Sequence, residues 1–270
     1  MAFGQSARPI PGAVATLGVS DRVAFLRKTY AHLGGALIAF AALTGFLLRY
    51  TSGFSWGFSK WALTAGNGWG WLAVLALFMA VGWVAQRLAL AERSRNLQYA
   101  GLGLAVFAEA MLLQPLLWVV MLKFGDHATQ AMLINSLRHG GSIDGAVMSG
   151  LAGKVILEAV VITLVIFIGL TITVFLTKKD FSFMRGILTI CSFAALGVII
   201  ASIAFGFQLG AIFCGLMVLL MAGYVLYQTS LIMSYFPPTH HVAASLMLFS
   251  TIATLFWYVL QLVMSLNDRR

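Results

Sequence analysis

The sequence predicts an all-α integral membrane protein, built as a bundle of seven transmembrane helices. Of its 270 residues, 61% are hydrophobic and only 9% are charged, and the mean hydropathy is +0.95. Because roughly half apolar residues is usual for a globular domain, a soluble chain of this length would not cover so much apolar surface. The apolar residues also gather into runs of about 18 or more with few charges, which is typical of helices that cross a bilayer.

Seven apolar segments are each long enough to span a bilayer as a helix. They cover residues 30–49, 69–90, 98–122, 152–177, 186–206, 209–233 and 242–266. The fifth and sixth segments are joined by a very tight connection at 207–209, which predicts an antiparallel hairpin. Pro237 and Pro238 separate the sixth segment from the seventh, because proline breaks a helix interior. The longest connection, 123–151, is rich in Gly, Ser, His and Asn, and we expect it to be partly ordered.

The distribution of Lys and Arg favours a cytoplasmic N-terminus, with residues 1–28 as a cytoplasmic arm and 29–270 as the membrane domain. The basic residues on the inside would be Arg8, Arg22, Arg27, Lys28, Arg87, Arg93, Arg95, Lys178, Lys179 and Arg185. Those on the outside would be Arg49, Lys60, Lys123, Arg138, Lys154, Arg269 and Arg270. The last two run against an outside C-terminus, so a re-entrant or shallow seventh segment remains an alternative. This scatter explains the net charge of +9 without nucleic-acid binding.

Glu109 is the clearest functional candidate, because it stands inside the third segment, in VFAEAMLLQPLL. Ionisable groups within a span are costly and mark functional sites by default. Loss of water disfavours the charged form of such a carboxyl. The residue can act as a proton site, a cation ligand or a neutral hydrogen-bond partner of another helix, and the sequence leaves these readings open.

Two further polar patterns lie in the spans. Glu158 follows Lys154 at the i,i+4 spacing that allows a salt bridge near the outer interface, or alternatively an outer mouth. The last two segments carry a polar stripe that predicts hydrogen bonds between helices or, alternatively, a water-filled path. The stripe contains Tyr224, Gln228, Thr251, Thr254, Tyr258, Gln261 and Ser265.

Other chemistries find no support in the sequence. It contains no Walker loop, HExxH, CxxC or nucleophile elbow, so we expect neither an enzyme nor a bound cofactor. His240 and His241 lack the acidic or cysteine partners of a metal site, so no metal is expected. The seventh segment has no lysine that could form a retinal Schiff base. Several glycines are expected to allow close helix packing: Gly34, Gly35, Gly101, Gly103 and Gly169.

The stretch TVFLTKKDFSFMRG, which contains Lys178, Lys179, Asp180 and Phe181, resembles the signature turn of the Bax inhibitor-1 family. Four other stretches are similar to its first, third, sixth and last spans: FLRKTYAHLGGAL at 25–37, FAEAMLLQPLL at 107–117, GYVLYQTSLI at 223–232 and TLFWYVLQLV at 254–263. The resemblance implies a seven-helix fold with one central helix surrounded by the others. It also implies calcium leak across a membrane and, for bacterial members, modulation of a membrane-bound ATP-dependent protease.

In the family, leak is attributed to two aspartates, one in the sixth span and one in the seventh, that share a proton and lock the helices closed. Two neighbouring carboxyls behave in this way because both cannot ionise cheaply in one apolar site. Here the matching positions hold Gln228 and Thr251. These two residues can hydrogen-bond and hold the helices together, but neither titrates.

Two hypotheses follow from these observations. The first is a cation leak, for calcium or protons, whose latch is lost or moved to Glu109. The second is a non-conducting regulator of a membrane-bound protease or another membrane partner, with function in the N-terminal arm and cytoplasmic loops. A bacterial inner membrane is the most economical location for either.

Overall fold

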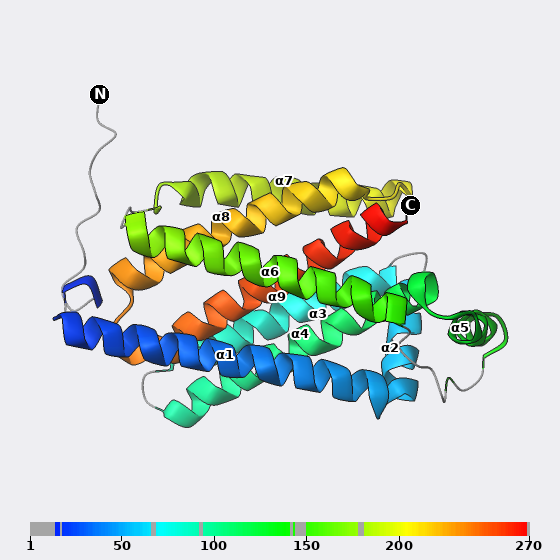
Figure 1. Ribbon diagram of the computed structural model, residues 1–270, viewed down its shortest axis with the longest axis horizontal. Coiled ribbons are helices and arrows are strands. Elements are labelled where there is room, and N and C mark those ends of the chain that lie inside the picture. The colour runs from blue at the N-terminus through cyan, green and yellow to red at the C-terminus, as the bar shows by residue number, and fades with distance from the viewer. Residues whose placement is uncertain are drawn as a thin grey trace.

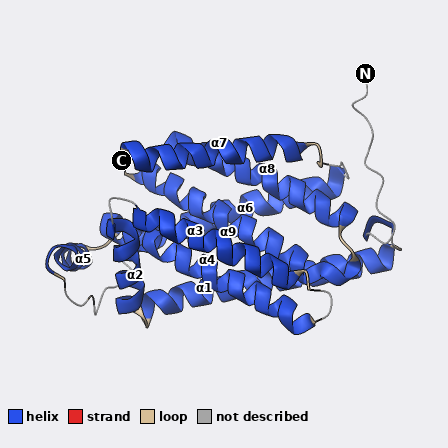
Figure 2. Cartoon of the chain, turned by 180° about the vertical axis from the view of Figure 1, so that it is seen from behind, coloured by secondary structure: helices blue, strands red, loops and turns tan. Residues whose placement is uncertain are grey.

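The computed structural model describes residues 14–16, 18–65, 69–91, 94–140, 143, 150–177 and 181–268. The described residues contain helices and no strand, which confirms the predicted all-α class (Figures 1 and 2). The α-helices are α1 (Val19–Arg49), α2 (Ser52–Thr64), α3 (Trp69–Ala89), α4 (Arg95–Phe124), α5 (His127–His139), α6 (Gly150–Thr177), α7 (Met184–Phe205), α8 (Ala211–Tyr235) and α9 (His241–Asn267). Two short 3-10 helices, η1 (Val14–Thr16) and η3 (Pro238–His240), complete the described elements.

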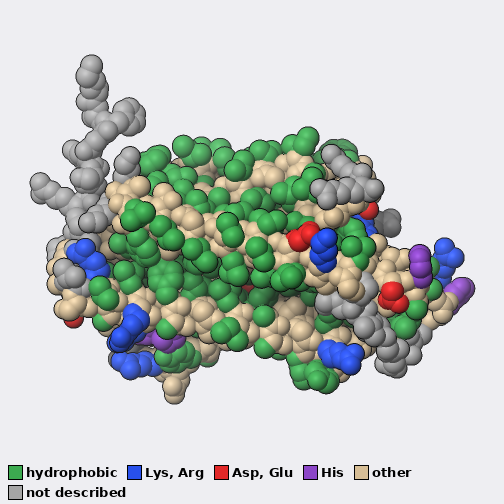
Figure 3. All heavy atoms as spheres, viewed as in Figure 1, with side chains coloured by type: hydrophobic (Ala, Val, Ile, Leu, Met, Phe, Trp, Pro, Cys, Tyr) green, Lys and Arg blue, Asp and Glu red, His purple; other side chains and the backbone are tan. Residues whose placement is uncertain are grey.

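Seven of these helices are long and apolar enough to cross a membrane, namely α1, α3, α4 and α6 to α9. They run along the long axis of the molecule, and the start of α1 and the end of α9 lie at opposite ends of the bundle (Figure 1). The 27 residues of α9 exceed the roughly 20 that a span needs, so the last segment is a full-length helix. Apolar side chains cover the middle of the face in Figure 3, while charged side chains gather toward the two ends. The chain is therefore an integral membrane protein.

Two helices share the interior of the bundle. In their most apolar stretches, 67% of the residues of α4 and 61% of those of α9 are buried, against 11% for α7. Helix α9 packs against α1, α3, α4, α6 and α8, whereas α7 packs mainly on α8. Helix α9 is therefore the central helix that the resemblance implied, and α4 lies directly against it.

Helices α2 and α5 were not predicted as helices. They lie together at one end of the bundle (Figure 1). Trp56 of α2 donates its indole N–H to Ser136 Oγ of α5 at 2.9 Å, and Lys60 Nζ donates to the Ser136 carbonyl at 2.8 Å. Each is only 13 residues long, which is too short to span and explains why a search for apolar spans misses them.

Only one of the five glycines expected at close helix contacts has that role. A Cβ on Gly101 of α4 would lie 2.6 Å from the Ala85 carbonyl oxygen and 2.8 Å from the Ala89 nitrogen of α3. Gly34, Gly35, Gly103 and Gly169 have nothing within 4 Å of such a Cβ, so the expectation was wrong for them. Their helices carry glycine on faces that no neighbouring helix approaches closely.

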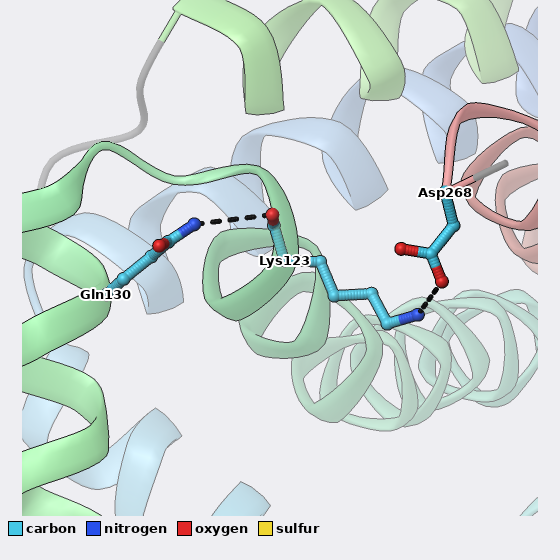
Figure 4. Close-up of polar contacts among 3 residues, drawn as sticks. All are labelled: Lys123, Gln130 and Asp268. Atoms are coloured by element: carbon cyan, nitrogen blue, oxygen red, sulfur yellow. Dashed lines mark hydrogen bonds and ion pairs between the residues drawn. The ribbon is translucent and has the colours of Figure 1, made fainter. Parts of the chain in front are cut away.

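Polar contacts join three helices at the end of the bundle where α4, α5 and α9 meet. Lys123 Nζ of α4 lies 2.7 Å from Asp268 Oδ2, directly after α9 (Figure 4). Gln130 of α5 donates its amide to the Lys123 carbonyl at 3.3 Å. The two charged side chains remain 43% and 54% exposed, so this ion pair contributes little to stability by itself.

Candidate functional site

Glu109 lines a partly open cavity of about 370 Å³ between the helices. The residue is 6% exposed, and among the described residues its carboxyl has no hydrogen-bond or ion-pair partner. Its position follows from the sequence of α4, which is apolar on nearly every side and therefore lies in the interior. The sequence left three roles open for Glu109: a proton site, a cation ligand or a neutral hydrogen-bond partner of another helix. Among the described residues, no other helix offers Glu109 a hydrogen bond, so the third role finds no support there.

Three polar residues of α9 line the same cavity, at the helical spacing of the predicted stripe: Thr254, Tyr258 and Gln261. The Thr254 hydroxyl donates to the Ser250 carbonyl of its own helix at 2.8 Å. Gln261 Oε1 accepts a hydrogen bond from the Cys214 thiol of α8 at 3.4 Å. These residues give the cavity a polar edge, and Gln261 also takes part in a hydrogen bond between α8 and α9, as expected for the stripe.

Gln228 and Thr251 form the contact that the sequence allows. Thr251 Oγ1 of α9 donates to Gln228 Oε1 of α8 at 2.7 Å, and it also lies 3.2 Å from the Met247 carbonyl. Thr251 is 7% exposed. A short hydrogen bond between uncharged groups in an apolar bundle ties the two helices together without any group that titrates.

The Gln228–Thr251 pair and the Glu109 cavity are neighbours along α9. Thr251 precedes Thr254, which lines the cavity, by one helical turn. Around this turn the side chains of Leu248, Ile252 and Leu255 are buried in the main core. Along α9, the cavity residue Thr254 is thus followed toward the start of the helix by apolar packing and the hydrogen bond between α8 and α9.

The remaining candidates lie away from the cavity. Glu158 Oε1 lies 3.9 Å from Lys154 Nζ on α6, with both side chains substantially exposed, and neither lines the Glu109 cavity. The Tyr224 hydroxyl forms a 2.9 Å hydrogen bond with Ser192 of α7, which makes it a contact between helices. The polar groups thus divide into a cavity set around Glu109 and a set that joins helices.

The signature turn is only partly described. Lys178, Lys179 and Asp180 lie outside the described residues. Phe181 directly follows them, and its backbone N–H donates to Ser230 Oγ of α8 at 3.1 Å. The turn is thereby tied to the helix that carries Gln228. The described residues hold no group of three or more His, Cys, Asp or Glu side chains that could bind a metal ion.

Sequence reasoning missed a buried polar network beside the cavity helix. Ser55 of α2 donates to Gln114 Oε1 at 2.7 Å and accepts a 2.8 Å hydrogen bond from Trp118 Nε1. The Gln114 amide in turn donates to the carbonyls of Ala110 and Thr44 at 3.1 and 3.4 Å. The available signal was the i,i+4 spacing of Ser55 and Ser59, which places both hydroxyls on one face of a helix.

A bundle of seven long apolar helices, with a buried carboxyl beside a partly open cavity, defines the class: a multi-pass helical membrane protein. The family model described as "Inhibitor of apoptosis-promoting Bax1" matches residues 128–268, slightly more than half of the chain. The chain therefore belongs to the Bax inhibitor-1 family. The matched region includes Gln228 and Thr251, and Glu109 lies before it.

Two curated relatives resemble parts of the chain. The protein named "Bax inhibitor 1" from Schizosaccharomyces pombe is 31% identical over 129 residues, which cover 46% of this chain and 47% of that protein. The uncharacterized protein PA2604 of Pseudomonas aeruginosa is 37% identical over 113 residues, which cover 41% of this chain and 50% of that protein. The chain thus spans about half the length of the curated relatives it matches. No solved structure matches the chain.

Proposed function

We propose that this protein is a cation leak of the Bax inhibitor-1 type in which Glu109 is the proton-responsive group. The observation that carries the proposal is the unpartnered, buried Glu109 carboxyl facing a cavity edged by Thr254, Tyr258 and Gln261. A carboxyl that is buried without a partner is stable either as the protonated acid or with a bound cation. Such a group responds both to pH and to cation concentration.

In this mechanism, the Gln228–Thr251 hydrogen bond would hold α8 and α9 together in the closed state, and it would not sense pH. Neither residue titrates, so pH acts on the leak through Glu109. When Glu109 is protonated, the cavity holds no charge and the apolar packing beside Thr251 closes the path. When Glu109 ionises, a cation is drawn into the cavity. The path for ions then opens only if α8 and α9 separate at the Gln228–Thr251 hydrogen bond.

Calcium and protons are the ions we propose, because the family resemblance implies a calcium leak and a carboxyl exchanges protons directly. The membrane is proposed to be a bacterial inner membrane, with the N-terminus in the cytoplasm because short connections on that side are richer in Lys and Arg. The lipid bilayer is then the protein's principal surroundings. The proposal involves no catalysis and no cofactor.

The test is calcium flux into liposomes that contain the purified protein, measured from pH 5 to 8. Glu109→Gln is the test variant and Glu158→Gln the matched control, because Glu158 is an exposed carboxyl whose only ion pair among the described residues is the 3.9 Å contact with Lys154. We expect pH-dependent flux that Glu109→Gln alters and Glu158→Gln leaves unchanged. Folded protein that gives no flux above empty liposomes at any pH would sink the leak proposal.

A second candidate function is a non-conducting regulator of a membrane-bound ATP-dependent protease or another membrane partner. The direct Gln228–Thr251 hydrogen bond and the apolar packing around it favour this reading, because they close the α8–α9 interface. Function would then reside in the N-terminal arm and the cytoplasmic loops. Deletion of residues 1–20 should abolish regulation of the protease while the unfolding temperature of the membrane domain stays the same.

A further inference from the structure

Aromatic side chains form much of the wall of the Glu109 cavity. Trp71 of α3 and Trp257 of α9 stack with ring centroids 5.7 Å apart and an angle of 17° between their planes. Phe213 of α8 meets Tyr258 of α9 edge to face at 6.3 Å. The face of an aromatic ring carries partial negative charge and attracts cations, and Trp does so most strongly.

Among the described residues that line this cavity, Glu109 is the only acidic or basic one. The residues that α2, α3, α7 and α8 contribute to the lining are all apolar, and α9 contributes Thr254, Tyr258 and Gln261. The titratable groups that face Glu109 are therefore the Tyr258 phenol in the lining and, behind Gln261, the Cys214 thiol. Among the described residues, no Lys, Arg or His lines the cavity to neutralise a Glu109 carboxylate, so we expect a ligand or a proton to do so.

The residues that line the cavity favour one class of cation over another. Ca²⁺ takes about six to eight oxygen ligands, and this wall offers one carboxyl and a few uncharged oxygens, so calcium would pass through with part of its water shell and would not be held tightly. An organic cation with apolar substituents needs no such shell, because its substituents pack on apolar and aromatic surface. A volume of about 370 Å³ also falls within the range of roughly 300–1,000 Å³ usual for small-molecule sites.

We propose that the cavity is a binding site for a lipophilic monovalent organic cation, such as a quaternary ammonium or phosphonium ion, which pairs with the Glu109 carboxylate between the aromatic rings. Binding displaces one proton from Glu109, so one positive charge replaces another. The inference rests on the proposed function only in taking Glu109 as the ionisable group of the cavity. It does not require the protein to conduct ions.

The experiment measures binding of tetraphenylphosphonium to the full-length purified protein in detergent, by equilibrium dialysis from pH 5.5 to 8.5. We expect one saturable site per chain, at least tenfold weaker affinity at the lowest pH, and release of close to one proton per cation bound. Glu109→Gln should weaken binding at least tenfold. Trp257→Leu should weaken it several-fold, because it removes one ring of the stacked pair.

Three controls keep the outcome decisive. Glu158→Gln should bind as the unchanged protein does, and neutral triphenylphosphine oxide should not compete for the site. Thermal unfolding of each variant shows that it is folded. No saturable binding by the folded protein, or binding that neither pH nor Glu109→Gln alters, would overturn the inference. If the protein binds tetraphenylphosphonium but gives no calcium flux, only the proposed leak is overturned. If it gives calcium flux but does not bind tetraphenylphosphonium, only the proposed organic-cation site is overturned.

Discussion

The Thr251 hydroxyl of α9 donates a 2.7 Å hydrogen bond to Gln228 Oε1 of α8. In the proposed function, this neutral pair takes the place of the two titratable carboxyls that the family resemblance implies. An amide and a hydroxyl hold the helices together at every pH between 5 and 8, because neither changes charge in that range. The contact itself is therefore not expected to respond to pH in this range.

Thr251→Val tests the contribution of this hydrogen bond, because valine keeps the shape of threonine without its hydroxyl. Hydrogen bonds between membrane helices contribute about 0.6 kcal/mol on average and up to about 1.7. We expect the free energy of unfolding in detergent to fall by about 1 kcal/mol. Thr251→Ser keeps the hydroxyl and is the control. Equal stability of the valine variant and the unchanged protein would show that the contact adds nothing.

Restoring two carboxyls at these positions should create a pH switch. In a Glu109→Gln background, Gln228→Asp combined with Thr251→Asp places two carboxyls where the hydrogen bond now lies. They share a proton at low pH and repel each other once both ionise, so calcium flux should rise with pH. Liposome flux from pH 5 to 8 measures this, and each single aspartate variant is a control. Flux that does not change with pH in the double variant would contradict the assignment of the latch positions.

Gly101→Ala should destabilise the bundle, because its Cβ would lie 2.6 Å from the Ala85 carbonyl oxygen of α3. Overpacking of this kind costs about 1–3 kcal/mol. Gly103→Ala is the matched control on the same helix, since nothing lies within 4 Å of its Cβ. Alanine in place of glycine inside a helix otherwise stabilises by about 0.5–1 kcal/mol, so the two variants should shift the unfolding temperature in opposite directions.

Ser55→Ala should loosen the attachment of α2 to α4. The substitution removes the acceptor of the Trp118 indole N–H and the donor to Gln114, and both groups are buried. A buried polar group without a partner costs about 1–3 kcal/mol, so we expect the free energy of unfolding to fall by at least about 2 kcal/mol. Ser59→Ala is the control, because Ser59 bonds only the Ser55 carbonyl of its own helix among the described residues. A similar loss for both variants would argue against the network.

Asp126 gives a prediction about pH outside the membrane. A hydrogen bond from the Thr129 side chain, followed by backbone N–H groups at the start of α5, holds the pKa of Asp126 below its usual value. A carboxylate whose pKa is lowered by folding stabilises the folded state above its unfolded pKa, and this stabilisation is lost as pH falls through the folded pKa.

Hydrogen exchange of the α5 amides tests this directly. Protection of α5 should fall as the pH drops from 5 to 3. In Asp126→Asn, the protection of the α5 amides against exchange should no longer depend on pH in this range. The amides of α4 serve as an internal reference. A pH dependence that is unchanged in the asparagine variant would assign the effect to another group.

Six of the seven spans were predicted closely because they depend on local properties of the chain, whereas α1 begins at Val19, well before the expected segment 30–49. The expected segment 69–90 is α3, which ends at Ala89, and the expected 152–177 is α6, which begins at Gly150. The length of an apolar run is set by bilayer thickness and is visible without knowledge of any neighbour. For the same reason, the short helices α2 and α5, which depend on contacts with α4 and with each other, were missed.

The sequence by itself determined that this is a seven-span membrane protein with one carboxyl, Glu109, inside its third span, and that Gln228 and Thr251 are groups that do not titrate. Tertiary structure alone decided that Glu109 faces Thr254, Tyr258 and Gln261 across a cavity walled by Trp71 and Trp257. It also decided that Gly101, and not Gly103, meets a neighbouring helix. The reason is that an apolar helix can bury any of its faces, and only packing against its neighbours fixes its rotation.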